Sequence, residues 1–188
     1  MEPKLIMKTI RYSLTLLFAF VGALTATSTP AALPLQVGDI APLVEGKDQD
    51  GTKWKLSNEI GKDVILLYFY PKDDTKGCTK EACSLRDRMT DLKGDDVEVV
   101  GVSFDNAESH RRFIFKYSLN FPLLVDTEGK IADAYGTRRE TGKKMDRRVS
   151  FLIGLDGRII HITDSPDPEV HLVEMQRAIK NLQGKTSP

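Results

Sequence analysis

A chain of 188 residues that is 40% apolar and 29% charged has the length and composition of one soluble globular domain with a sizeable core. Its 27 basic and 27 acidic side chains cancel. The N-terminal stretch holds three of the basic residues and one of the acidic residues. Without it, 24 basic and 26 acidic residues remain. This balance gives no electrostatic reason to expect a nucleic-acid partner.

The first 32 residues read differently from the rest. Lys4, Lys8 and Arg11 precede the apolar run Leu14–Leu24, and several small residues follow it. This is the layout of a secretory signal peptide, which predicts export to the periplasm or another extracytoplasmic compartment without stable membrane association. We expect residues 1–32 to be signal peptide and linker, cleaved or disordered, and residues 33–188 to form the domain. The alternative is an uncleaved anchor, but about 11 apolar residues fall short of the roughly 20 that span a bilayer.

The first predicted elements of the domain are a hairpin, a buried strand and a helix. The turn-forming residues Asp48–Gly51 lie between Leu43-Val44 and Thr52–Leu56, which predicts a small hairpin. The unbroken apolar run Val64–Tyr70 indicates a strand buried on both faces. After a short polar loop, helix-forming residues predict a helix over about Thr79–Leu92.

A second strand and helix follow. Val97–Ser103 is rich in β-branched residues, as strands are. Asp105 and Glu108 have the spacing of a capping box, which predicts a helix that continues to Tyr117. Leu123–Val125 gives a short third strand.

The C-terminal part predicts a short helix ending near Tyr135, a hairpin and a final helix. Val149–Leu155 and Arg158–Ile162 flank Asp156-Gly157, the strongest short-range hairpin signal. Apolar residues at helical spacing predict the last helix over about Glu169–Leu182. Strands that alternate with helices indicate an α/β sheet covered by helices.

Cys78 and Cys83 are the only cysteines in the chain. The buried strand, the short loop and the helix-forming residues that follow place Cys78 where a helix opens. There the free N–H groups and the helix dipole stabilise a thiolate, which indicates thiol redox chemistry. A purely structural disulfide is not favoured, because closing a loop of five residues removes little entropy from the unfolded chain. A metal site is also not favoured, since none of the three histidines has a Cys/His ligand spacing.

The same stretch resembles a known family. Pro71, Thr75 and Cys78 reproduce the Pro-x-x-x-Thr-x-x-Cys signature of the peroxiredoxins, and Gly77–Cys83 looks like the bacterioferritin comigratory protein group, also called peroxiredoxin Q. The resemblance runs from about Val37 to Gly184 through further matching segments: Val37–Pro42, Tyr68–Asp73, Gly101–Ser103, Phe121–Leu124, Tyr135-Gly136 and Arg148–Ile153.

The resemblance implies a fold and an activity. The fold would be a thioredoxin-like α/β sandwich with a central mixed β-sheet flanked by helices. The activity would be that of an atypical 2-Cys peroxiredoxin, which reduces hydrogen peroxide and organic hydroperoxides. An intramolecular disulfide would then be reduced by a thioredoxin-like dithiol, without metal, haem or flavin. Members of this group are often monomeric, and we expect a monomer here.

The site residues follow from the chemistry and the resemblance together. Reduction of a peroxide needs a thiolate that attacks one oxygen, and Cys78 fits this peroxidatic role. Thr75 is three residues upstream and can turn its hydroxyl toward both sulfur and peroxide, or serve only as a turn or N-cap residue. Pro71 can fix the loop and shelter the thiolate, although a proline at a strand end is common without function. By resemblance, Cys83 is the resolving cysteine, which condenses with the sulfenic acid on Cys78.

The cation beside the sulfur is expected from a distant strand. By resemblance it is Arg148, whose planar fork can hydrogen-bond sulfur and substrate together. Arg147 is the alternative, because adjacent strand residues face opposite sides of a sheet. We expect the other charged and aromatic candidates to occupy structural positions without a part in the reaction. These are surface or strand positions for His110, His161 and His171, a solvated face for Lys72, Lys76 and Lys80, and the core for Trp54.

Two other functions compete with a peroxidase. An exported thiol–disulfide oxidoreductase that acts on proteins would use Cys-x-x-Cys, whereas four residues separate Cys78 from Cys83. A copper-delivering module would need Cys-x-x-x-Cys and a nearby histidine, and that cysteine spacing does not occur in the chain.

Overall fold

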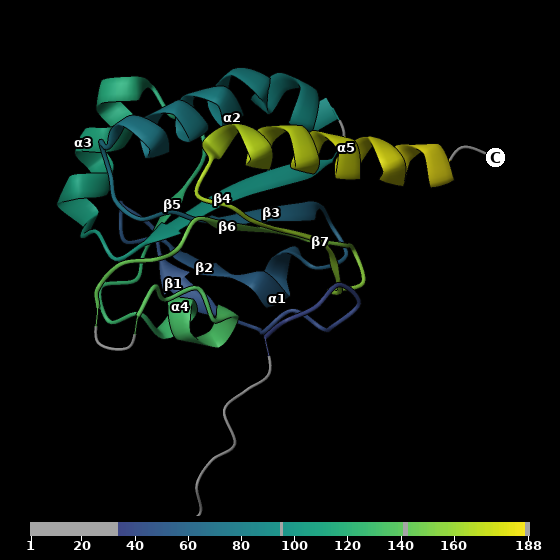
Figure 1. The fold of residues 1–188 in the computed structure, drawn as a ribbon, viewed down its shortest axis with the longest axis horizontal. Coiled ribbons are helices and arrows are strands. Elements are labelled where there is room, and N and C mark those ends of the chain that lie inside the picture. Colours follow the sequence, from purple (N-terminus) through teal and green to yellow (C-terminus); the bar gives the residue numbers. More distant parts are fainter. Residues whose placement is uncertain (1–33, 95, 141–142, 187–188) are drawn as a thin grey trace, which may run out of the picture. The chain divides into compact units, whose positions relative to one another are not determined.

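A mixed five-stranded sheet forms the centre of the fold (Figure 1). The computed structural model describes residues 34–94, 96–140 and 143–186, all in the unit Leu33–Pro188. The strand order is β5-β4-β3-β6-β7; β3 pairs parallel with β4 and antiparallel with β6. The strands are β3 Val64–Phe69, β4 Val97–Ser103, β5 Leu123–Val125, β6 Val149–Ile153 and β7 Ile159–Asp164. A separate two-stranded sheet pairs β1 Glu45–Lys47 with β2 Lys53–Lys55, which confirms the first hairpin.

Helices cover both faces of this sheet, as Figure 1 shows. One layer holds α2, α3 and α5, and the other holds α1, α4 and the β1–β2 hairpin. The predicted α/β sandwich with a central mixed sheet is therefore confirmed. The helices are α1 Leu56–Glu59, α2 Lys76–Gly94, α3 Ala107–Tyr117, α4 Lys130–Tyr135 and α5 Pro168–Thr186.

The two layers explain the unbroken apolar run of β3. Successive strand residues point to opposite faces, so both sets of side chains have to be apolar when both faces are covered. Leu66, Tyr68 and Tyr70 pack in the core beneath α2 and α5. Ile65 and Leu67 pack in the second core, toward α4, where Trp54 is also buried as predicted.

Several predicted boundaries differ from the structure. Helix α2 begins at Lys76 instead of Thr79. Asn106 is the N-cap of α3, and its side chain accepts from Ser109 N at 2.9 Å, so the predicted capping box at Asp105 is wrong. The Asp105 carboxylate instead accepts hydrogen bonds from Ser103 Oγ and from the backbone N–H of Asp73, each at 2.9 Å.

The prediction for the histidines is wrong in two cases. His110 and His171 lie on helices and are 0% and 2% exposed, so both are core residues. His161 lies half-buried on strand β7, as expected.

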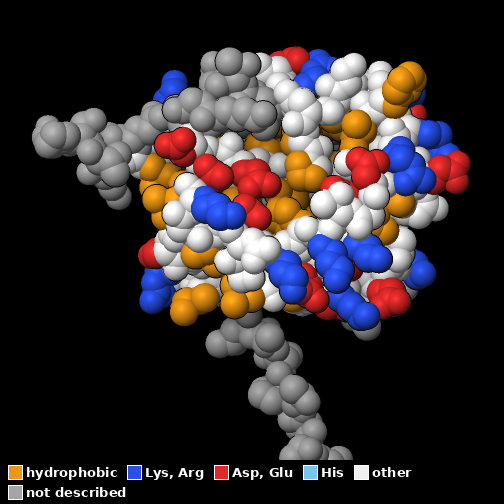
Figure 2. Space-filling model, turned by 180° about the vertical axis from the view of Figure 1, so that it is seen from behind, with side chains coloured by type: hydrophobic (Ala, Val, Ile, Leu, Met, Phe, Trp, Pro, Cys, Tyr) orange, Lys and Arg blue, Asp and Glu red, His pale blue; other side chains and the backbone are white. Residues whose placement is uncertain are grey.

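The predicted signal peptide falls on residues 1–32, outside the described residues. Within the described part of the chain, no helix has the length and apolarity that a bilayer span requires. Basic and acidic side chains of the described residues lie interspersed on the face in Figure 2, in keeping with the balanced charge.

Candidate active site

The loop between β3 and α2 brings Cys78 into the interior. Asp74 has a positive φ of 55°, which turns the chain, and Thr79 N donates to Thr75 O at 2.8 Å to open the helix. Cys78 is the third residue of α2 and only 1% exposed. Its side chain therefore lies at the positive end of the helix dipole, packed against Tyr68 and neighbouring core residues.

Arg148 is the cation that contacts the sulfur. Its Nη2 lies 3.3 Å from Cys78 Sγ, its Nη1 binds Glu81, and its Nε donates to Pro166 O at 3.3 Å. Gly77 makes room for this approach, because a Cβ at that position would lie 3.2 Å from Arg148 Nη2. The guanidinium thus contacts Cys78, Glu81 and Pro166, and the N–H group of Nη2 faces the thiol.

Arg147 points the other way. Its guanidinium is paired with Asp164 at the surface and donates to Gly136 O at 2.9 Å. The structure therefore places Arg148, and not Arg147, beside the sulfur, which is the register that the motif Arg-x-Ser-Phe implied.

A buried carboxyl and a buried histidine complete the surroundings of Arg148. Burial raises the pKa of Glu81 to about 7, although Arg148 opposes the shift. Glu81 Oε1 has no hydrogen-bond partner among the described residues and lies 3.8 Å from His171 Nδ1. Burial lowers the pKa of His171. A neutral ring fits its contacts, since Nε2 donates to Ser165 O and Nδ1 accepts from Ser150 Oγ, each at 2.8 Å.

Sequence reasoning missed Glu81 and His171. One signal was available for Glu81, which is three residues after Cys78 and so on the same side of a helix. His171 gave no such signal, because it reaches the site from α5.

Pro71 and Thr75 lie in the loop between β3 and α2, as predicted. Pro71 lies beside a cavity, whereas Thr75 is at the surface. Pro71 lines a cavity of about 290 Å³ together with Arg148 and Pro166. Thr75 is exposed, and its Oγ1 donates to Lys72 O at 3.2 Å. Among the described contacts, the Thr75 hydroxyl makes no hydrogen bond to the sulfur.

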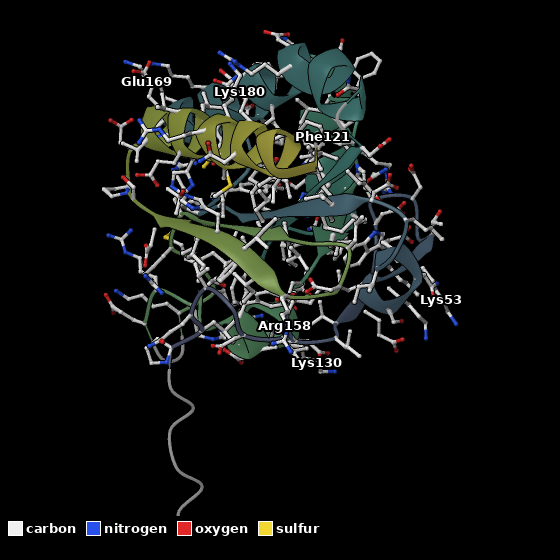
Figure 3. The ribbon with its side chains drawn as sticks, turned by 90° about the vertical axis from the view of Figure 1, so that its right-hand side faces the viewer. Lys53, Phe121, Lys130, Arg158, Glu169 and Lys180 are labelled. Atoms are coloured by element: carbon white, nitrogen blue, oxygen red, sulfur yellow. The ribbon has the colours of Figure 1, made fainter. Side chains whose placement is uncertain are left out.

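The second cysteine lies on the same helix. Cys83 is half-buried, five residues after Cys78, and both are free thiols. Lys72, Lys76 and Lys80 are exposed, as expected. Lys80 pairs with Glu169, the residue that Figure 3 labels at the start of α5. Among the described residues, no group of three or more histidine, cysteine or acidic side chains could hold a metal ion.

Comparisons with known proteins show what the chain is similar to. Residues 37–162, which include both cysteines and Arg148, match the AhpC/TSA family. The chain is 46% identical over 136 residues to a protein named peroxiredoxin Bcp from Escherichia coli, covering 70% of this chain and 86% of that protein. It is 38% identical over 158 residues to peroxiredoxin Bcp from Bacillus subtilis, covering 81% and 100%.

Solved structures show the same fold. Peroxidoxin BcpB from Mycobacterium tuberculosis superimposes with a TM-score of 0.74 at 29% identity, covering 81% of this chain and 99% of that one. The bacterioferritin comigratory protein from Xanthomonas campestris, whose structure is described in terms of alkyl peroxide reduction, gives a TM-score of 0.67 at 25% identity, covering 73% and 90%.

Proposed function

Because this chain belongs to the AhpC/TSA family and is a peroxiredoxin, a thiol-dependent peroxidase, we propose that Cys78 is its peroxidatic cysteine. The contact of Arg148 Nη2 with the buried Cys78 Sγ is the observation that carries this proposal. A cation and a helix N-terminus together favour the thiolate, which is the attacking species. The relatives do not favour the alternative of an oxidoreductase that acts on protein substrates.

The proposed reaction has two products. The thiolate of Cys78 attacks one oxygen of hydrogen peroxide or of an organic hydroperoxide and becomes a sulfenic acid. The O–O bond breaks, and the other oxygen leaves with both electrons and takes up a proton as water or alcohol. Arg148 faces the place where this negative charge develops, so its fork stabilises the transition state. Pro71 shelters the thiolate, and Thr75 turns its exposed hydroxyl from Lys72 O toward the bound peroxide.

Cys83 is proposed to resolve the sulfenic acid as an intramolecular disulfide, with release of water. Both cysteines lie within α2, and five residues along a regular helix separate Cα atoms by about 8.6 Å. A disulfide tolerates only about 4.4 to 6.8 Å between Cα atoms. The first turns of α2 must therefore unwind before the bond can form, and a thioredoxin-like dithiol then reduces it.

One equivalent of hydrogen peroxide should convert the reduced protein to a form with a Cys78–Cys83 disulfide, detected by mass spectrometry of peptides. We expect faster amide exchange over residues 77–88 in this form, because helical hydrogen bonds are lost there. Exchange in α5 should change little. Reduced thioredoxin should reverse both changes and sustain steady consumption of peroxide.

Two results would count against this scheme. Failure of the unmodified protein to consume hydrogen peroxide in the presence of thioredoxin would contradict the roles proposed for Cys78 and Cys83. Equal exchange over residues 77–88 in both redox states, with the disulfide present, would remove the unwinding step.

Export and the monomeric state are further proposals, which rest on the N-terminal sequence and on the group's usual state. The basic residues and the apolar run Leu14–Leu24 support a cleaved signal peptide. N-terminal analysis of the protein from its native host should find a start between Ala26 and Leu33. An intact N-terminus on soluble cytoplasmic protein would contradict export.

A further inference from the structure

A buried polar network holds the centre of the active-site loop. Asp73, in the middle of the loop Pro71–Thr75, is 6% exposed and uses both carboxylate oxygens. Tyr70 Oη donates to Oδ1 at 2.7 Å, and His110 Nδ1 lies 2.9 Å from Oδ2. The backbone N–H of Asp73 donates to Asp105 Oδ2 at 2.9 Å. Side chains that follow β3 and β4, together with one from α3, thus converge on one loop residue.

The ring of His110 joins the active-site loop to the sheet. Nδ1 lies 2.9 Å from Asp73 Oδ2, and Nε2 lies 3.2 Å from the carbonyl oxygen of Leu124. Tyr70 Oη also lies 3.5 Å from Nδ1. His110 is fully buried, so its contact with Asp73 is shielded from solvent.

A second anchor from α3 holds the next residue of the loop. Asp74 adopts the left-handed conformation and accepts from Lys116 Nζ at 2.7 Å and from Tyr117 Oη at 2.5 Å. This ion pair is exposed, with 55% of the lysine side chain and 47% of the aspartate side chain accessible. Exposed pairs contribute little. The contact between His110 and Asp73 is buried instead, so removing one partner leaves a buried polar group unsatisfied.

The anchored loop leads directly into the reactive helix. Thr75 is the first residue after the anchor, and its carbonyl accepts the N–H of Thr79. The position of Asp73 therefore governs where the Thr75 hydroxyl can reach. A displacement of about 1 Å at a reacting centre can cost a hundredfold in rate.

We propose that His110, through its buried contact with Asp73, is a positioning residue that fixes the active-site loop for the attack of Cys78 on the peroxide. The proposal rests on the proposed function, because it concerns the same reaction. His110 touches neither the sulfur nor the substrate and acts only through Asp73 and the loop.

The positioning role is tested with His110→Gln, Asp73→Asn and the double variant. Each single variant should slow the first oxidation of Cys78 by hydrogen peroxide by about tenfold to a hundredfold. The double variant should be no slower than the slower single variant, since both act along one path. Lys116→Gln, which removes the exposed cation from Asp74, is the matched control and should change the rate by less than about twofold.

A purely structural role makes different predictions. Alkylation of Cys78 by iodoacetamide does not use the peroxide-binding loop, so its rate should change much less than the peroxide rate in His110→Gln. Equal changes in both rates, or multiplied losses in the double variant, would overturn the proposal. If the unmodified protein fails to consume hydrogen peroxide, the proposed function itself fails, whatever the His110 and Asp73 variants do.

Discussion

Replacement of Cys78 by serine should abolish peroxide consumption completely. The attack needs a thiolate, and a serine hydroxyl in the same place is not ionised at neutral pH and does not accept an oxygen atom from a peroxide. Serine is close to cysteine in volume, so the core formed by Cys78 with Tyr68 and Ala82 should survive. The measurement is hydrogen peroxide consumption in the presence of excess thioredoxin and its reductase.

Cys83→Ser is the matched control, because it makes the same chemical change five residues further along α2. This variant should still consume about one equivalent of peroxide per chain in the first turnover. It should then stop, since no disulfide forms for thioredoxin to reduce. Equal loss of the first turnover in both variants would contradict the division of roles between Cys78 and Cys83.

The layers of the fold could be predicted from the sequence because the strands carry a strong local signal. Val64–Tyr70 is apolar at every position, which fits only a strand covered on both sides, and the structure places its residues in two cores. The start of α2 carries a weaker local signal. Gly77 has a low helix propensity, which argues against a start at Lys76, but its lack of a side chain admits the Arg148 guanidinium.

The position of Cys78 could also be predicted locally, because a strand, a loop and a helix fix where the thiol lies. The environment of Arg148 could not. Glu81, His171 and Ser165 come from α2, from α5 and from the end of β7, and their approach depends on how the elements pack. His110 likewise contacts Asp73, which is 37 residues earlier in the chain. Residue spacing carries no signal for contacts of this range.

Arg148 has two partners that respond differently to its removal. The thiol of Cys78 loses its only described cationic contact, 3.3 Å from the sulfur. Glu81 loses the partner of its Oε2 and is then a buried carboxyl without any cation. Breaking a buried ion pair costs about 3–5 kcal/mol when the remaining charge persists. Glu81 already has a pKa raised to about 7 by burial, so it should take up a proton and reduce this cost.

Arg148→Ala should therefore fold with a moderate loss of stability and slow the first oxidation of Cys78 by about a hundredfold or more, the usual effect of removing one donor that stabilises developing negative charge. A smaller thiolate fraction at neutral pH, measured by ultraviolet absorbance, should accompany it. Arg147→Ala is the control, because that side chain makes a surface pair with Asp164, and its rate should change by less than about twofold. A larger effect of Arg147→Ala on either measurement would show that the wrong arginine has been assigned to the sulfur.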